Sequence, residues 1–175
     1  MSILKWATFG ISLTVLVGCV VIPMSRTYYE PNPADGILIR SASCGWNTTT
    51  LDAIEKDVDG ITFSLFPKYD PGRPLSVYIL LGRTSKTVEI DPEKIEVRFD
   101  DGAGSVRPET SGVKDAGPYY SKKIDFVLPL WIDANNIAMT FLQGFIKLDG
   151  RDVRTLQFRF RRVTKSDVYY GSINC

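Results

Sequence analysis

Residues 156–161 read LQFRFR, and this alternation decides the fold class. Successive side chains of an extended strand point to opposite faces, so the three apolar side chains would share one face and the three polar ones the other. The same period of two recurs at residues 61–65, 75–79, 95–99 and 124–128. Each segment therefore predicts a strand with one buried and one wet face.

The remaining segments complete an all-β pattern. Short strands are expected at 37–40, 87–90 and 168–170, and residues 139–148, apolar on both faces, are expected to form one central strand in which Gly144 marks a bulge or a close backbone approach. About nine strands separated by turns predict an antiparallel, immunoglobulin-like β-sandwich. Helical spacing occurs only at residues 48–58, where a helix is the alternative to a strand.

Composition excludes several classes of function. The 175 residues contain 21 Lys and Arg, 20 Asp and Glu, and no His. This balance, without a long basic run, gives no electrostatic footprint for nucleic acid. The lack of His excludes Ser-His-Asp and Cys-His catalysis and His-containing zinc sites. The sequence singles out no catalytic residue, and we expect no metal and no cofactor.

The N-terminus has the features of a targeting segment. Residues 1–24 carry one charge, Lys5, before an apolar stretch that leads to Leu16-Val17-Gly18-Cys19. This segment resembles the signal peptide of bacterial lipoproteins, whose lipobox places Leu, a small or branched residue and Gly or Ala before a Cys. The resemblance implies removal of residues 1–18 and attachment of fatty acyl chains such as palmitate to Cys19, which anchor the protein to a membrane.

The resemblance also implies a location. Val20 after the cysteine, in place of Asp, points to an outer-membrane anchor facing the periplasm, with the inner membrane as the alternative. An uncleaved apolar anchor over residues 6–24 is the alternative to processing. The expected organisation is a signal peptide at 1–18, a lipidated cysteine and tether at 19–36 and the sandwich domain at 37–175, with the Pro-rich stretch 27–35 as the flexible part of the tether.

Lipidation of Cys19 would leave two cysteines, Cys44 and Cys175. In an oxidising compartment two unpaired thiols are unusual, so we expect a Cys44–Cys175 disulfide, with two separate buried thiols as the alternative.

Two segments are candidate partner sites. Residues 100–121 show no sustained alternation and are expected to form a long loop whose Arg107, Tyr119 and Tyr120 contact a ligand or an envelope protein partner. The alternative is that the tyrosines begin the next strand and pack on its flanks. The densest basic stretch consists of Arg159, Arg161, Arg162 and Lys165. Alternation places Arg159 and Arg161 on one strand face, which could meet anionic lipid headgroups or an acidic partner, or be an ordinary solvated face.

Residues 100–104 read DDGAG, which could offer oxygen ligands to a hard cation, although a strand-ending turn has the same composition. Together these features predict a lipid-anchored binding or structural module of the cell envelope and not an enzyme. The alternative is a carboxylate-based hydrolase of envelope polysaccharide, which would need two acidic side chains that converge in one cleft.

The disulfide is testable by non-reducing peptide mapping of the exported protein. A bridge closing a loop of this size would stabilise the fold by about 4 to 5 kcal/mol in the chain-entropy model. Replacing Cys44 or Cys175 with Ser should therefore lower the melting temperature by several degrees. Recovery of both thiols in free form would contradict the bridge.

Overall fold

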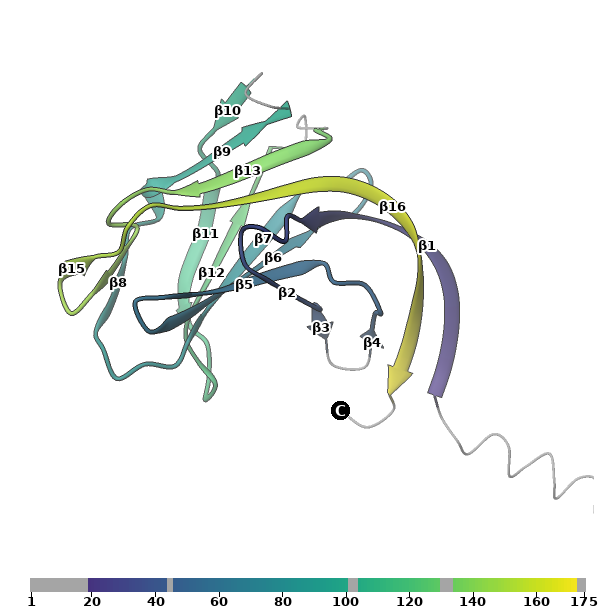
Figure 1. The fold of residues 1–175 in the computed structure, drawn as a ribbon, viewed down its shortest axis with the longest axis horizontal. Helices are drawn as coiled ribbons and strands as arrows, with labels where there is room; N and C mark the ends of the chain where they lie inside the picture. The colour runs from purple at the N-terminus through teal and green to yellow at the C-terminus, as the bar shows by residue number, and fades with distance from the viewer. Residues whose placement is uncertain (1–18, 44–45, 101–103, 130–133, 173–175) are drawn as a thin grey trace, which may run out of the picture.

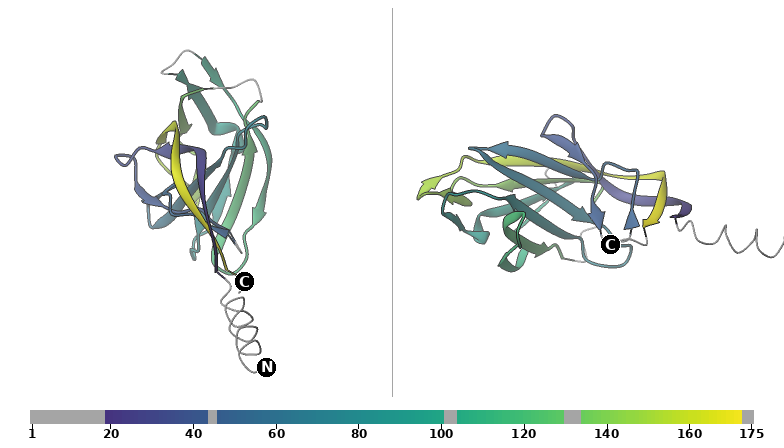
Figure 2. Two further views of the ribbon diagram at one scale, coloured as in Figure 1. Left: turned by 90° about the vertical axis from the view of Figure 1, so that its right-hand side faces the viewer. Right: turned by 90° about the horizontal axis from the view of Figure 1, so that it is seen from below.

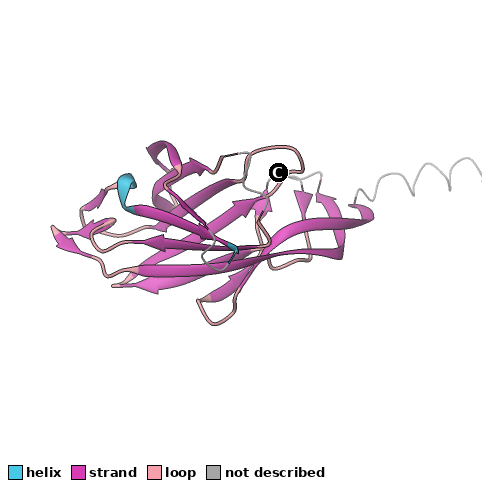
Figure 3. Cartoon of the chain, turned by 90° about the horizontal axis from the view of Figure 1, so that it is seen from above, coloured by secondary structure: helices cyan, strands magenta, loops and turns pink. Residues whose placement is uncertain are grey.

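A computed structural model describes residues 19–43, 46–100, 104–129 and 134–172. Within these residues it defines sixteen strands, nine of them five or more residues long, and every strand pairing is antiparallel. Strands dominate the described part of the chain (Figure 3), and a three-residue 3₁₀ helix forms at Pro92–Lys94. The expected all-β antiparallel sandwich is confirmed.

The first sheet contains seven strands and both ends of the described chain (Figure 1). In spatial order its strands are β10 (Gly104–Val106), β9 (Ile95–Phe99), β13 (Asn136–Phe141), β16 (Leu156–Ser172), β4 (Trp46–Asn47) and β3 (Ala42–Ser43), with β1 (Cys19–Pro31) on β16. β1 pairs with β16 along its whole length, from Cys19 opposite Ser172 to Pro31 opposite Phe160. The two strands form a curved ribbon that extends beyond the sandwich (Figures 1 and 2).

The second sheet has six strands, and a third sheet has three. In spatial order the second consists of β11 (Glu109–Asp115), β12 (Tyr120–Val127), β7 (Ser76–Gly82), β6 (Ile61–Lys68), β5 (Ala53–Val58) and β2 (Ile37–Ile39). The third consists of β15 (Arg151–Asp152), β14 (Ile146–Leu148) and β8 (Val88–Ile90).

Aromatic side chains join the two larger sheets. Phe63 of β6 stacks on Phe158 of β16 at a centroid distance of 5.4 Å and meets the edge of Phe141 of β13 at 5.1 Å. All three side chains are fully or almost fully buried, and so is Phe160. The inward direction of Phe158 and Phe160 predicted from the LQFRFR alternation is therefore correct.

The tether expected at residues 19–36, with 27–35 as its flexible part, is not formed, and the sheet begins at Cys19 instead of residue 37. Residues up to Pro31 belong to β1, and Tyr28 and Tyr29 are buried. The hydroxyl of Tyr29 donates to the carbonyl of Ala134 at 2.7 Å. The burial of the tyrosine rings and the pairing with β16 stabilise a strand up to Pro31. The turn-forming Pro-Asn-Pro stretch ends the strand there instead of extending a flexible segment back to residue 27.

The possible helix at residues 48–58 is also not formed. Residues 53–58 are strand β5, which pairs with β6 through a two-residue turn. Asp59 and Gly60 in this turn both have positive φ, 53° and 79°, which is the hairpin geometry that Asp-Gly favours. The hairpin signal therefore outweighed the helical spacing of three apolar residues.

The expected central strand at 139–148 and the expected long loop at 100–121 are also wrong. Residues 139–148 do not form one strand, because β13 ends at Phe141 and the chain turns through Gly144, with φ of 77°, into β14 of the third sheet. Residues 100–121 are not one long loop, because they contain β10 and β11. β11 is an edge strand with exposed side chains on both faces, so it carries no hydrophobic alternation.

The aromatic contact between the sheets predicts a large loss of stability on truncation. Phe63→Ala should lower the free energy of unfolding by about 3–5 kcal/mol, because it removes a fully buried ring and leaves a cavity. Ile37→Ala is the matched control, since the Ile37 side chain is 68% exposed. Equal urea midpoints for the two variants would show that the Phe63 contacts do not hold the sheets together.

Candidate functional site

A pocket of about 740 Å³ lies where β9, β13 and β16 meet the connection from β1 to β2. The strand register explains why its polar residues share one face. Ala138 lies opposite Arg98 on one side and Arg159 on the other, while Arg161 lies between Asn136 and Glu30. These positions alternate with the buried residues of the same strands, so they face away from the core.

Arg159 is fixed by the connection between β1 and β2. Its guanidinium donates to both carboxylate oxygens of Asp35, at 2.6 and 3.0 Å, and its backbone N–H donates to the same carboxylate at 2.8 Å. Burial alone would raise the pKa of Asp35, but the hydrogen bonds from Arg159 outweigh it and hold this pKa below its usual value. Asp35 therefore stays ionised and ties the connection to β16.

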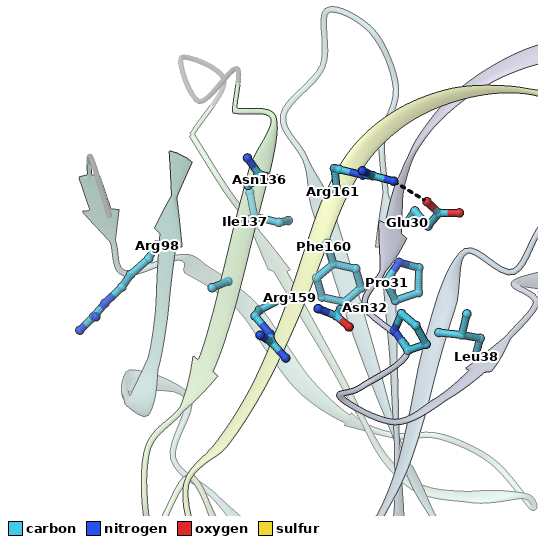
Figure 4. A pocket seen from close by; sticks show the side chains of 12 residues that line it. Glu30, Pro31, Asn32, Leu38, Arg98, Asn136, Ile137, Arg159, Phe160 and Arg161 are labelled. Carbon is cyan, nitrogen blue, oxygen red and sulfur yellow. Dashed lines mark hydrogen bonds and ion pairs between the residues drawn. The ribbon is translucent and has the colours of Figure 1, made fainter. Parts of the chain in front are cut away.

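Glu30 is shared by two cations of β16. Its carboxylate accepts from Lys165 and from Arg161, the latter at 3.4 Å (Figure 4). The hydrogen bond from Lys165, supported by Arg161, holds the pKa of Glu30 below its usual value. One carboxylate thus balances two positive charges.

The rest of the pocket combines one weakly paired arginine with amide and apolar groups. Arg98 contacts Glu96 at 3.2 Å on its own strand, an exposed pair that contributes little stability. No hydrogen bond of the Asn136 side-chain amide is found within the described residues, and Asn32 also lines the pocket. Pro31, Pro33 and Leu38 supply apolar walls. The pocket therefore offers positive charge, amide groups and CH surface.

A second polar cluster is buried beside the ribbon. Arg26 of β1 donates to Asp52 at 2.5 Å and lies 3.5 Å from Asp167 of β16. Asp52 also accepts from the backbone N–H and the hydroxyl of Ser41, both at 2.7 Å. Asp167 accepts from the N–H and hydroxyl of Thr49 at 3.0 and 2.8 Å.

This cluster braces the fold and does not form a catalytic pair. Burial alone would raise the pKa of Asp167, but hydrogen bonds from Thr50, Thr49 and the Val168 N–H outweigh it and lower this pKa. Desolvation acts against the charge of Arg26, yet its contacts with Asp52 raise its pKa. Asp167 is therefore held as an anion, and the hydrogen bonds of Asp52 and Asp167 join residues 41–52 to the ribbon.

The sequence-predicted contact residues are not brought together. Tyr119 is 80% exposed and Tyr120 is 37% exposed at the turn between β11 and β12. Arg107 lies before the opposite end of β11, about 20 Å away along that strand. Tyr120 does begin a strand, as the alternative proposed, but neither ring is buried. Cys19 opens β1, while Cys44 and Cys175 lie outside the described residues.

Asp100 has a local structural role. One of its carboxylate oxygens accepts from the backbone N–H groups of Asn135 and Asn136, at 2.9 and 3.3 Å. Of the suggested cation loop at 100–104, Gly104 begins β10, and residues 101–103 lie outside the described residues. Among the residues that the structure describes, no group of three or more acidic or Cys side chains is arranged to hold a metal.

The pocket joins residues that the sequence did not connect. Arg159 and Arg161 stood out from their alternation, whereas Arg98, Glu30 and Asp35 did not. Their strands or connections are far apart in the chain, and no local pattern states which strands are neighbours. The alternation at 95–99 did indicate that Arg98 faces away from the core, but not which strand lies beside it.

Comparison of the chain with protein-family models, curated proteins and solved structures finds no match. In the described part of the chain, no helix has the length and apolar character needed to cross a lipid bilayer.

The lowered pKa values predict acid sensitivity. Asp167, Asp35 and Glu30 bind protons more weakly when folded than when unfolded, so their stabilisation is complete above the unfolded pKa of about 4 and is lost as the pH falls through the lower folded values. Urea unfolding between pH 2 and 7 should show this loss. Asp167→Asn should reduce stability at pH 7 and flatten the acid dependence, and an unchanged dependence would contradict the assignment of Asp167.

Proposed function

We propose that the protein is a lipid-anchored binding or accessory module of the cell envelope, held to the outer membrane through Cys19 and facing the periplasm. In this proposal the pocket beside Arg159 receives the ligand. The observation that carries it is the position of Cys19 at the far end of the β1–β16 ribbon from the pocket.

The ribbon separates the two ends of the proposed module. Its thirteen-residue strand β1 has a contour of about 40 Å from Cys19 to Pro31. Glu30 and Pro31 line the pocket at the other end. A lipid on Cys19 would therefore hold the domain at the membrane while the pocket remained open to the periplasm.

The surface next to Cys19 supports contact with lipid. Ile22 and Met24 lie two residues apart on β1, on one face, and are 43% and 39% exposed. Exposing apolar side chains to water costs free energy, and contact with a bilayer removes that cost. Ile22 and Met24 would therefore add to the membrane affinity of the acyl chains.

The carboxyl groups favour a binding role over hydrolysis. A glycoside hydrolase needs one carboxyl with a raised pKa as general acid. Within the described residues, the carboxyl groups with a shifted pKa are Glu30, Asp35, Asp115 and Asp167, and each is shifted downward. Asp52 and Asp167, which converge on Arg26, are engaged in structural hydrogen bonds. Asp59, Asp149 and Asp152 line a second pocket together with Lys86 and Arg151, and the Asp149 carboxylate there accepts from the Thr87 N–H at 2.9 Å.

Lipidation is tested by the intact mass of protein extracted from membranes. The expected mass lacks residues 1–18 and includes a diacylglyceryl-type modification on Cys19. Cys19→Ala should leave an unprocessed precursor, whereas Cys44→Ala, the matched control, should be processed normally. A mature protein that retains Met1 would contradict processing and favour the uncleaved anchor, and mature protein found only in the inner membrane would overturn the outer-membrane assignment.

A further inference from the structure

We propose that the pocket binds an acidic oligosaccharide with at least two carboxylate or phosphate groups, held by Arg98 and Arg161. This inference deepens the proposed binding role of the pocket, on which it rests, but it does not depend on the lipid at Cys19.

The charge around the pocket favours an anion. Arg98, Arg159, Arg161 and Lys165 face the carboxylates of Glu30, Asp35 and Glu96, which leaves an excess of one positive charge. Asp35 is committed to Arg159, and Glu30 already accepts from two cations. The Arg98 and Arg161 side chains are 59% and 68% exposed, so an incoming anion can reach them.

The directions of the arginines favour an extended ligand over a single small anion. Figure 4 shows the guanidinium groups of Arg98, Arg159 and Arg161 pointing in different directions. Arg98 and Arg159 are separated by two strand spacings, about 10 Å, and Arg159 and Arg161 by about 7 Å along β16. Charges spaced along one molecule would meet these groups, whereas one phosphate ion would reach only one of them.

The backbone around the pocket favours a saccharide over a peptide. An extended peptide gains most of its affinity by adding to an open strand edge. Here the edge is closed, because the Arg159 N–H donates to Asp35 and the Arg159 carbonyl accepts from the Asn32 N–H at 2.8 Å. β13 is paired on both sides. Recognition along β13 and β16 must therefore use side chains.

Those side chains suit sugar hydroxyls. The side-chain amide of Asn136 can donate and accept, as a hydroxyl requires, and that of Asn32, whose oxygen already accepts from the Ala34 N–H at 3.0 Å, can still donate. Arginine forks bind carboxylate or phosphate through two parallel hydrogen bonds. Pro31, Pro33 and Leu38 offer CH surface to sugar rings. A volume of about 740 Å³ suits a ligand of several rings and exceeds what an inorganic anion fills.

Calorimetric titration of the detergent-solubilised full-length protein tests the proposal with defined probes. The probes are hexagalacturonate, phosphorylated maltohexaose, neutral maltohexaose, galacturonate monomer and hexaglutamate. We expect the hexagalacturonate or the phosphorylated maltohexaose to bind, and the stronger of the two identifies the source of the anion. The neutral hexamer, the monomer and the peptide should bind at least about tenfold more weakly, because each lacks the spaced charges or the hydroxyls.

Variants separate a built site from general charge attraction. Arg98→Ala should weaken binding about tenfold by removing one charged hydrogen-bond donor. Ala138→Leu keeps every charge but fills the floor between Arg98 and Arg159, and it should also weaken binding. Arg73→Ala, an exposed arginine in the β6–β7 connection of the other sheet, is the matched control and should bind as the wild type does.

Three outcomes would overturn the inference: no binding of either acidic hexamer, equal binding of the neutral hexamer or hexaglutamate, or wild-type affinity in both Arg98→Ala and Ala138→Leu. Thermal melts of each variant verify that it is folded, and Asn136→Ala, which also keeps every charge, replaces Ala138→Leu if the latter unfolds, with weaker binding again expected. Cys19→Ala protein should bind normally, so failed lipidation and failed ligand binding are distinguishable.

Discussion

The pairing of β1 with β16 is the constraint on which the rest of the molecule depends. It joins the first and last described strands over thirteen residues, and β16 at the same time pairs with β13. Because residues near both ends of the chain must meet before this ribbon forms, its contacts have high sequence separation and carry a large entropic cost. The burial of Tyr29, with its hydroxyl bonded to Ala134, offsets part of that cost. The same register brings Glu30 beside Arg161 and sets the connection with Asp35 against Arg159.

The ion pairs divide by environment. Arg26, Asp52 and Asp167 are largely shielded from water, so removing one partner would strand the others and cost far more than the intact cluster contributes. Arg98 and Glu96 are exposed and exchange readily with solvent ions. Between these limits, Asp35 is nearly buried while Arg159 is half exposed. The Asp35–Arg159 pair holds one side of the pocket rigid, whereas a ligand can replace Glu96 as the partner of Arg98 on the other side. A ligand could therefore bind without disturbing the fold.

Local alternation was enough to predict the fold class, because residues such as Phe158 and Arg159 lie on opposite faces of any strand they occupy. It could not predict β11, an edge strand whose two faces are both wet, or the break at Gly144, where the chain leaves one sheet for another. The sequence analysis also failed at residues 27–31, where the buried Tyr28 and Tyr29 continue a strand up to the turn-forming residues. The candidate site was predicted only in part: Arg159 and Arg161 stood out, but Arg98 and Glu30 become their neighbours through strand order, which depends on pairings far apart in sequence.

A closed edge and an open face give the pocket its character. Strands at sheet edges usually invite pairing with other chains, and the hydrogen bond that the Arg159 N–H donates to Asp35 removes that possibility for β16 next to the pocket. The polar face of β9, β13 and β16 then presents only side chains, and side-chain recognition selects ligands by charge spacing and hydroxyl geometry instead of by backbone complementarity. Arginine and lysine partners lower the pKa values of Glu30 and Asp35, so both carboxylates are ionised at neutral pH and the charge balance of the site is kept there. A site of this kind is suited to holding an anionic polymer reversibly, with an affinity that falls as ionic strength screens its exposed arginines.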